Sequence, residues 1–410
     1  MIPLADAQAH VLARVEPLPA VAVPAAGARG TVLAAAVTST EDVPPFANTA
    51  MDGYAVRAAD VAAASDGSPV ELPVVAEVAA GHPAPGVLAP GRAMRIFTGA
   101  PMPPGADAVV MVEDTERLDG GHRVRIRRAA TPGDHVRPAG DDLRAGDEVF
   151  AVGEELTAGH LGVLATIGVD EVVVHRRPRV GVLSTGDELV EGTGPLVPGQ
   201  IRESNRAGLI ALLERDGFVP VDLGIVRDEE EAIAAAVGAG AATCDALLTS
   251  GGVSMGDVAL VRVVLERMGE MRWMQVAIRP AKPFAFGLVG PGPTPVFGLP
   301  GNPVSSMVSY EVLARPALRR MAGQPPGRWH RPCVPAVAAE GIRRRPDGKL
   351  HLARVRVERG DDGGLAVRLA GGQGSHQLTA LAHAQGLALV PDGEAVPPGG
   401  PVEVVLLAEV

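Results

Sequence analysis

The sequence has 410 residues, a formal net charge of -11 at pH 7, and 47% hydrophobic but only 3% aromatic residues. At about 100 to 200 residues per domain this length predicts several domains, and the acidic balance without a polybasic run means that a nucleic-acid partner is not expected. The chain has neither a signal-peptide pattern at its start nor a run of about 18 apolar residues, so we expect a cytoplasmic protein with no membrane partner.

The first half of the chain reads as a mixed domain interrupted by a β-rich one. Apolar positions at helical spacing predict an amphipathic helix over residues 4–16. Short strands separated by Gly and Pro predict a small β-rich domain over residues 43–136. We assign residues 1–42 and 137–177 together to an N-terminal mixed domain that serves dimerisation or links the other domains.

Strand and helix signals alternate through residues 178–323. Such alternation predicts a mostly parallel sheet with helices on both faces. β signals return over residues 324–410, which we expect to form a β-barrel-like C-terminal domain. The predicted fold class is therefore a multidomain α/β protein with smaller β-rich domains, and ligands of its central sheet should bind beyond the carboxyl ends of the strands.

Three predicted strand ends of that sheet are polar or rich in glycine. DALLTSGGVSMGD could gather backbone N–H groups around an anion, or could simply be a tight turn. STGDEL offers hydroxyls and acids to a polar ligand or a divalent cation, or is a capped turn. GLPGNP ends a strand and starts a helix. The candidate substrate-binding residues at these ends are Ser184, Thr185, Gly186, Ser250, Gly251, Gly252, Ser254, Gly301 and Asn302.

Other motifs fit a charged ligand less specifically. Lys282 lies between the prolines of RPAKP, where its ammonium could meet a phosphate or simply face solvent. Asp52-Gly53 in MDGYAV is a turn signal, and Asp142 belongs to an acidic loop that could hold Mg²⁺ or be solvated. The sequence lacks a P-loop and a dinucleotide-binding glycine motif, and its two cysteines are too few and too far apart for a disulfide framework or a zinc site.

Taken together, these blocks resemble the molybdopterin molybdenumtransferase family, MoeA in bacteria and the E domain of gephyrin in animals. The matching blocks keep the family's order over about residues 40 to 322: PPFANTAMDGYAV, IFTGAPMPPGADAVVMVEDT, GDDLRAGDEV, VGVLSTGDELVE, GQIRESNRAGLIALLERDG, DALLTSGGVSMGD, RPAKPFAFG and FGLPGNPVSS. The resemblance implies an elongated homodimer of four-domain subunits. It also implies a reaction in which adenylylated molybdopterin and molybdate, with Mg²⁺, give molybdenum cofactor and AMP.

The resemblance also implies roles for individual positions. Site residues from outside the α/β domain would be Asp52, Thr98 and Asp142, which would face the partner subunit's α/β domain. Those from within it would be Glu188, Asp228, Lys282, Pro300 and Pro303. We expect catalytic roles for Asp52, Asp142, Glu188 and Asp228, and Mg²⁺ ligation by Asp52, Asp142, Glu188 and Asp257. Molybdate is a dianion, so arginines or backbone N–H groups must supply its site.

The sequence departs from the family pattern at Ala259, and also at Gln275 and Arg279, where lysines are common in the family. The family often has an acid three residues after the last Gly of GGVSxG, where this chain has Ala259, so either Asp257 takes that role or the site is altered. An altered site would suit a paralogue that prefers tungstate, or one that stores the pterin cofactor or acts as a scaffold. The related adenylyltransferase is less consistent with the extra β domains. Earlier-pathway proteins and molybdoenzyme apoproteins are the further partners that the resemblance implies.

Overall fold

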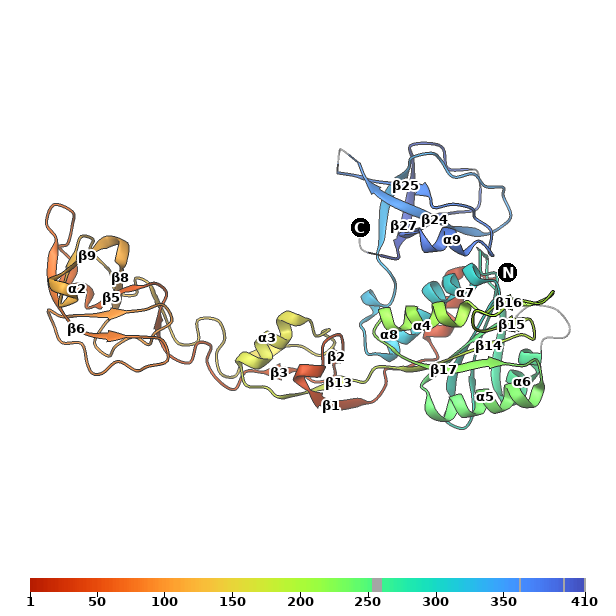
Figure 1. Cartoon of the computed structure of the whole chain (residues 1–410), viewed down its shortest axis with the longest axis horizontal. Helices are drawn as coiled ribbons and strands as arrows, with labels where there is room; N and C mark the ends of the chain where they lie inside the picture. Colours follow the sequence, from red (N-terminus) through yellow and green to blue (C-terminus); the bar gives the residue numbers. More distant parts are fainter. Residues whose placement is uncertain (253–259, 361–362, 394, 409–410) are drawn as a thin grey trace.

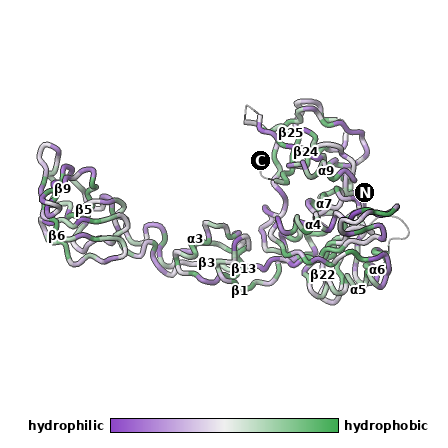
Figure 2. The backbone as a smooth tube through the Cα atoms, in the orientation of Figure 1, coloured by the Kyte–Doolittle hydropathy of each residue, from purple (hydrophilic) through white to green (hydrophobic). Residues whose placement is uncertain are grey.

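Four compact units follow one another along an elongated molecule in the computed structural model (Figure 1), which describes residues 1–252, 260–360, 363–393 and 395–408. Hydrophobic stretches recur in every unit, so each can bury apolar surface of its own (Figure 2). Within these ranges no helix is both long and apolar enough to cross a membrane.

The outer β unit, at the left of Figure 1, is a six-stranded sheet in the order β8-β5-β7-β6-β10-β9. Alternate residues of its strands face opposite sides: Tyr54 and Val56 belong to one apolar cluster, whereas Ala55 belongs to another. Its elements are β4 (Asn48–Thr49), β5 (Gly53–Val56), α2 (Ala58–Val61), β6 (Val70–Val78), β7 (Ala93–Ile96), β8 (Ala108–Met111), η2 (Val112–Asp114), β9 (Thr115–Leu118), η3 (Asp119–Gly121), β10 (Arg123–Ile126) and β11 (Val136–Arg137).

The mixed unit lies next along the molecule and is crossed twice by the chain. Its core gathers residues distant in sequence, such as Leu33, Leu164 and Val174. Thr157 starts α3 because its side chain and that of His160 cap each other's backbone N–H groups. The elements are β1 (Ala20–Pro24), η1 (Ala25–Gly27), β2 (Val32–Leu33), β3 (Val37–Thr38), β12 (Glu148–Phe150), α3 (Ala158–Thr166) and β13 (Glu171–His175).

The α/β unit is built on a six-stranded sheet in the order β17-β14-β18-β22-β21-β19. β17, β14, β18 and β22 are parallel, and β21 runs opposite to both of its neighbours. Its strands are β14 (Arg179–Thr185), β15 (Leu189–Val190), β16 (Ile201–Arg202), β17 (Val219–Val226), β18 (Ala246–Ser250), β19 (Gly269–Gln275), β21 (Pro283–Val289) and β22 (Thr294–Leu299). Its helices are α1 (Leu4–Leu12), α4 (Asn205–Arg215), α5 (Glu230–Thr243), α6 (Leu260–Met268), α7 (Pro303–Ser309), η4 (Tyr310–Ala314) and α8 (Arg315–Met321).

Both faces of this sheet are covered. Leu248 joins a cluster with α4, α7 and α1, whereas Leu247, the preceding residue, joins one with α5 and α6. Helix α1 therefore differs from the predicted division, which grouped it with the mixed unit: Val11 is fully buried in the core of the α/β unit. Periodicity in the sequence shows that one helix face is buried, but not which unit buries it.

A π-helical turn, η4, connects α7 to α8 next to Pro316. Proline has no N–H, so the carbonyl of Val312, four residues earlier, loses its usual helical donor. The side-chain amide of Gln8 in α1 donates to that carbonyl at 2.8 Å. This contact also ties α1 to the α/β unit.

The C-terminal unit is a closed barrel of five strands, because β24 pairs with both β25 and β26. A short strand of the α/β unit, β20 (Ile278–Arg279), pairs with β24 and joins the two units. The remaining elements are η5 (Pro326–Arg328), β23 (Cys333–Ala338), β24 (Leu350–Arg359), β25 (Leu365–Leu369), α9 (Leu378–Ala382), β26 (Gly386–Val390) and β27 (Gly400–Leu406). The predicted fold class, including the barrel, is confirmed.

Candidate active site

The carboxyl ends of β14, β18 and β22 converge at one edge of the central sheet. A Cβ on Gly251 would lie 2.7 Å from the carbonyl oxygen of Thr185, and one on Gly301 would lie 3.7 Å from the Cα of Gly251. Gly251 also has a φ of +100°, which L side chains rarely adopt. Glycine is therefore required at position 251 for these strand ends to approach so closely, whereas a Cβ at position 301 would make only ordinary van der Waals contact.

Asn205, the first residue of α4, bridges two of these ends. Its Nδ2 donates to the Ser250 hydroxyl and to the Gly301 carbonyl, each at 2.7 Å. Among the described residues, its Oδ1 and the Thr185 hydroxyl are buried atoms without a hydrogen-bond partner. Buried polar atoms are rarely left unpaired, so both can take part in binding a polar ligand.

Acids gather at the same edge. The backbone N–H of Asp228 donates to Asp187 Oδ1 at 3.3 Å. Burial, together with the negative charges of Asp187 and Glu188, raises the pKa of Asp228 above its ordinary value. Within the described ranges no group of three His, Cys, Asp or Glu side chains forms a metal site by itself. These acids suit Mg²⁺ when substrate phosphates supply further oxygen ligands.

The third strand end continues directly into a helix. β22 ends at Leu299, Pro300 is buried, and Asn302 precedes Pro303, the first residue of α7. The backbone N–H of Val304 donates to the Ser375 carbonyl of the barrel at 3.1 Å. This end of the sheet therefore adjoins the barrel loop around Ser375.

Lys282 lies on a fixed loop at the same junction. Its carbonyl accepts the N–H of Val276 at 2.8 Å, and the residue itself is exposed. The preceding Ala281 is buried with a φ of +76°, a conformation that favours glycine. No carboxylate in the described part of the chain pairs with Lys282, so its ammonium can meet an anion.

A basic pocket of about 660 Å³ opens between this loop and the barrel. Arg354 of β24, only 1% exposed, lines it and donates to the carbonyls of Gly372 and Gly374, each at 3.2 Å. No carboxylate among the described residues pairs with Arg354. Burial, and then the charge of Arg279, lowers the pKa of Arg354 to about 10. The cationic residues lining the pocket are Arg279, Arg343, Arg344, Arg345 and Arg354.

Two further candidate residues form one hydrogen-bonded pair in the outer β unit. Asp52 Oδ1 accepts the backbone N–H and the hydroxyl of Thr98, each at 2.7 Å. These two hydrogen bonds, with a smaller contribution from Arg95, lower the pKa of Asp52. Asp142 is exposed on the loop beside the mixed unit, and its N–H donates to the Val43 carbonyl at 2.9 Å.

Comparison with known proteins identifies the family. A molybdopterin molybdenumtransferase of Nostoc sp. is 38% identical over 378 residues, 90% of this chain and 84% of that protein. Molybdopterin molybdenumtransferase 2 of Mycobacterium tuberculosis is 40% identical over 380 residues, 91% of each chain. The chain belongs to the molybdopterin molybdenumtransferase, or MoeA, family.

Family models and solved structures agree. The MoeA N-terminal region (domain I and II) matches residues 2–168, a probable molybdopterin binding domain matches 181–320, and the MoeA C-terminal region (domain IV) matches 335–407. A molybdopterin biosynthesis MoeA structure from Pyrococcus horikoshii covers 100% of both chains at 32% identity and a TM-score of 0.81. A second from that organism, 28% identical, covers 99% of this chain and 100% of that one at 0.83. The predictions of an enzyme and of a transferase in molybdenum cofactor biosynthesis are confirmed.

The MoeA fold brings together only part of the predicted set. The residues at the sheet edge are Ser184, Thr185, Gly186, Glu188, Asp228, Ser250, Gly251, Gly252, Pro300, Gly301, Asn302 and Pro303. Asp52 and Thr98 adjoin β5 and β7 in the outer β unit, at the opposite end of the molecule from β14 (Figure 1). Ser254, Asp257 and Ala259 lie outside the described residues.

Residue patterns missed two site residues of this MoeA protein. Asn205 lies in SNR, where Ser204 and Asn205 look like an ordinary helix start. Arg354 lies in HLARVRVER, an alternating strand in which any arginine looks solvent-facing. The only indication that an arginine belongs to the site was the expected ligand, because a dianion requires a cationic site.

Proposed function

We propose that the protein inserts molybdate into adenylylated molybdopterin and releases AMP, with Mg²⁺ as cofactor and a homodimer as the active form. The observation that carries the proposal is the adjacency of two sites of different chemistry. The glycine-rich strand edge suits phosphate groups, and the basic pocket with Arg354 suits an oxyanion. The hydrogen bond from Val304 to Ser375 joins the two sites.

The basic pocket supports molybdate binding. Arg354 with a pKa of about 10 is still protonated at neutral pH, and its Nε has no partner among the described residues. Charge-assisted hydrogen bonds to an oxyanion are stronger than neutral ones. Molybdate would supply the negative charge that this buried guanidinium lacks, and Arg279 at the pocket wall would reinforce the site.

The strand edge supports binding of the pterin phosphates. The Gly251 N–H donates to the Leu299 carbonyl at 3.2 Å, so the Gly252 N–H and Lys282 are the donors that would hold the phosphoanhydride. Glu188 and Asp228 would hold Mg²⁺ together with phosphate oxygens, as Mg²⁺ sites commonly do. Bound Mg²⁺ would polarise the phosphoanhydride for attack by water or a molybdate oxygen. These side chains position the reactants and balance charge, so no covalent step on the protein is needed.

A homodimer would complete the site. Asp52 is exposed, yet two hydrogen bonds from Thr98 fix its carboxylate, so a preorganised acid faces outward from the outer β unit. The α/β unit of the same chain lies at the far end of the molecule (Figure 1). We infer that Asp52, Thr98 and Asp142 instead meet the α/β unit of the partner subunit.

The first test follows AMP release from adenylylated molybdopterin by the purified protein with Mg²⁺, with and without molybdate, and then cofactor transfer to an apoenzyme. Molybdate-dependent AMP release with active cofactor is the expected result. Tight pterin binding without turnover would instead support a storage or scaffold role, and preference for tungstate in the same assay would change the assigned oxyanion.

Subunit mixing tests the composite site. Asp52→Ala and Lys282→Ala are each expected to inactivate the homodimer. Random exchange makes half of the dimers mixed, and one of the two sites in each mixed dimer is intact. About one quarter of the wild-type activity should therefore return. The matched control mixes Asp52→Ala with Asp142→Ala, which should stay inactive because one subunit supplies both residues to a given site. Equal recovery in both mixtures would contradict this arrangement.

A further inference from the structure

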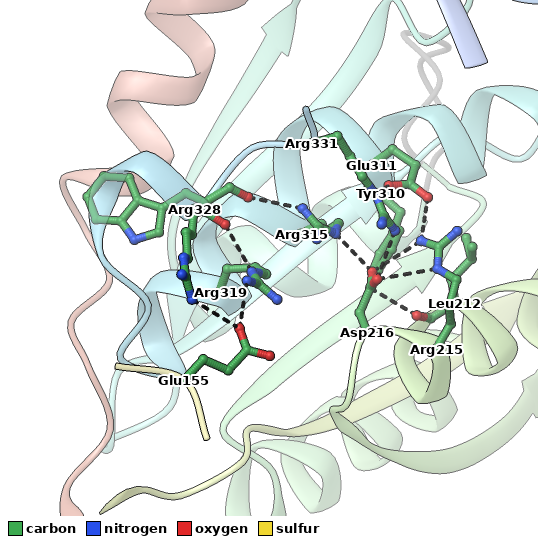
Figure 3. Close-up of polar contacts among 11 residues, drawn as sticks. Glu155, Leu212, Arg215, Asp216, Tyr310, Glu311, Arg315, Arg319, Arg328 and Arg331 are labelled. Carbon is green, nitrogen blue, oxygen red and sulfur yellow. Dashed lines mark hydrogen bonds and ion pairs between the residues drawn. The ribbon is translucent and has the colours of Figure 1, made fainter. Parts of the chain in front are cut away.

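Two buried acids lie where the α/β unit meets the linker to the barrel (Figure 3). The side chains of Asp216, which follows α4, and Glu311, in η4, are 3% and 5% exposed. Asp216 accepts from Tyr310 Oη at 2.8 Å, Arg315 Nε at 3.0 Å and Arg331 Nη2 at 2.8 Å. One carboxylate thus joins the helices of the α/β unit to Arg331, two residues before the first barrel strand.

Glu311 makes a second connection between the α/β unit and Arg331. It accepts from Arg215 Nη2 at 2.6 Å and from Arg331 Nε at 3.0 Å, so Arg331 contacts both acids. Burial alone would raise the pKa of Asp216, but its arginine neighbours, Arg315 first, outweigh burial and lower that pKa. The Asp216 carboxylate is therefore ionised at neutral pH and accepts hydrogen bonds from these cations.

The linker itself is held along its length. Arg315 Nη1 donates to the Trp329 carbonyl at 3.1 Å, and Arg319 Nε donates to the Arg328 carbonyl at 3.0 Å. The Trp329 indole donates to the Gln324 carbonyl at 2.6 Å. Such directional contacts make the linker a fixed connection rather than a free hinge.

The mixed unit is attached at the same place. Glu155 accepts from Gln324 Nε2 at 2.7 Å. It also accepts from Arg319 Nη2 at 3.5 Å, as Figure 3 shows. Three units therefore meet around one polar cluster, which we call the joint: Glu155, Arg215, Asp216, Tyr310, Glu311, Arg315, Arg319, Gln324 and Arg331.

The apolar contact between the barrel and the α/β unit is incompletely filled. A cavity of about 480 Å³ separates Leu212 and Met307 on one side from Leu381 and Leu387 on the other. Hydrophobic contact is non-directional, and a poorly filled interface restricts the angle between units less than close packing does. The pairing of β20 with β24 is one directional connection between the units. Hydrogen-bonded ion pairs also have a defined geometry, so the joint supplies a second one at a distance from that pairing.

We propose that Asp216 and Glu311 are positioning residues that fix the barrel on the α/β unit and so keep Arg354 opposite Arg279. The basic pocket is shared, because Arg279 comes from β20 of the α/β unit and Arg354 from β24 of the barrel, and these strands pair at Arg279 and His351. A change in the angle between the units therefore changes the pocket. The molybdate part of this inference rests on the proposed function, whereas the positioning part does not.

The positioning is tested by distance measurement in the full-length dimer. Spin labels on cysteines at Val263 of α6 and Val337 of β23, which are 47% and 43% exposed, report the angle between the units in a Cys333→Ser background. Labelled subunits are diluted with unlabelled ones. Asp216→Asn and Glu311→Gln should broaden and shift the distance distribution. Unchanged distributions in both folded variants would overturn the proposal.

A milder variant and a matched control complete the design. Tyr310→Phe removes one donor to Asp216 without changing any charge, so it should give a smaller shift and keeps the test valid if the acid variants fold poorly. Glu71→Gln removes a carboxylate that binds Arg123 and Arg125 within the outer β unit, and it should leave the distances unchanged.

Binding of molybdate alone then separates the two claims. Asp216→Asn should weaken the Kd about tenfold, since small misplacements of site groups are costly, and raise KM for molybdate more than it lowers kcat. If wild type binds no molybdate, the proposed function fails while the distance result stands. If the distances shift but the Kd stays within about twofold, the link between joint and pocket fails.

Discussion

Arg354, which we propose binds a ligand, and Arg215, which pairs with buried acids, are expected to contribute differently to the free energy of unfolding. Among the described residues, Arg354 is buried without an acid partner, and its pKa falls below the ordinary arginine value to about 10. At about 1.4 kcal/mol per unit, the charged form is destabilised by about 3 kcal/mol in the folded protein. Because the folded-state pKa is the lower one, this cost is fully present below pH 10 and disappears as the pH rises toward the ordinary pKa of arginine.

Arg354→Met removes this cost but also loses two long hydrogen bonds to carbonyls, at about 1.5 kcal/mol each. The two effects nearly cancel, so the free energy of unfolding should stay within about 1 kcal/mol of wild type. Burial lowers the pKa of Arg215, but Glu311 and Asp216 outweigh burial and raise it. Arg215→Met should therefore lose about 2 kcal/mol, because it leaves buried acids with fewer partners.

Urea unfolding with and without molybdate measures both effects. In wild type, molybdate at about 100 times its Kd should add about 2.7 kcal/mol of stability. Arg354→Met should lose that gain, whereas Arg215→Met, which disturbs the joint but leaves Arg354 in place, should keep part of it despite its lower starting stability. A loss of more than about 2 kcal/mol in Arg354→Met without molybdate would refute the reasoning, because the charge would then be structural.

Three further predictions concern the strand edge and its loop. Ala281→Gly should stabilise the protein by up to about 1 kcal/mol, because it relieves the positive φ; an unchanged or lower urea midpoint would contradict this. Asn205→Ala should cost about 1 to 2 kcal/mol of stability and lower kcat/KM for AMP release, since the bridge between Ser250 and Gly301 is lost; unchanged kcat/KM would exclude a role in the site. The acid limb of the pH profile should lie higher than for an ordinary Asp, because burial and neighbouring acids raise the pKa of Asp228. Asp187→Asn should move that limb to lower pH, and an unmoved limb would remove Asp228 from the titrating site.

Local sequence patterns were sufficient to predict those parts of the fold that depend on residues close together in the sequence. Strand and helix alternation from Arg179 to Met321 predicted the central sheet, since buried parallel strands and their covering helices each leave a periodic apolar pattern. The glycine-rich ends at Gly251 and Gly301 were predicted to approach a ligand, and the structure shows that the lack of a Cβ at Gly251 permits the close contact of β18 with the end of β14.

Long-range contacts could not be predicted in this way. Helix α1 was recognised as a helix but assigned beside the mixed unit, because periodicity does not identify the surface that buries it. Arg354 looked like any strand arginine until the barrel closed around it. Its neighbour in the pocket, Arg279, is 75 positions earlier in the chain.

The sequence by itself determined the elements, the family and the chemistry of the strand ends, because each is encoded in contiguous residues. Only the tertiary structure decided which charges are paired. Asp216 and Glu311 are distant in sequence yet share Arg331, whereas Arg354 has no acid partner among the described residues. The energy of a buried charge depends on its solvent exposure and its neighbours in space, and neither is a property of the local sequence.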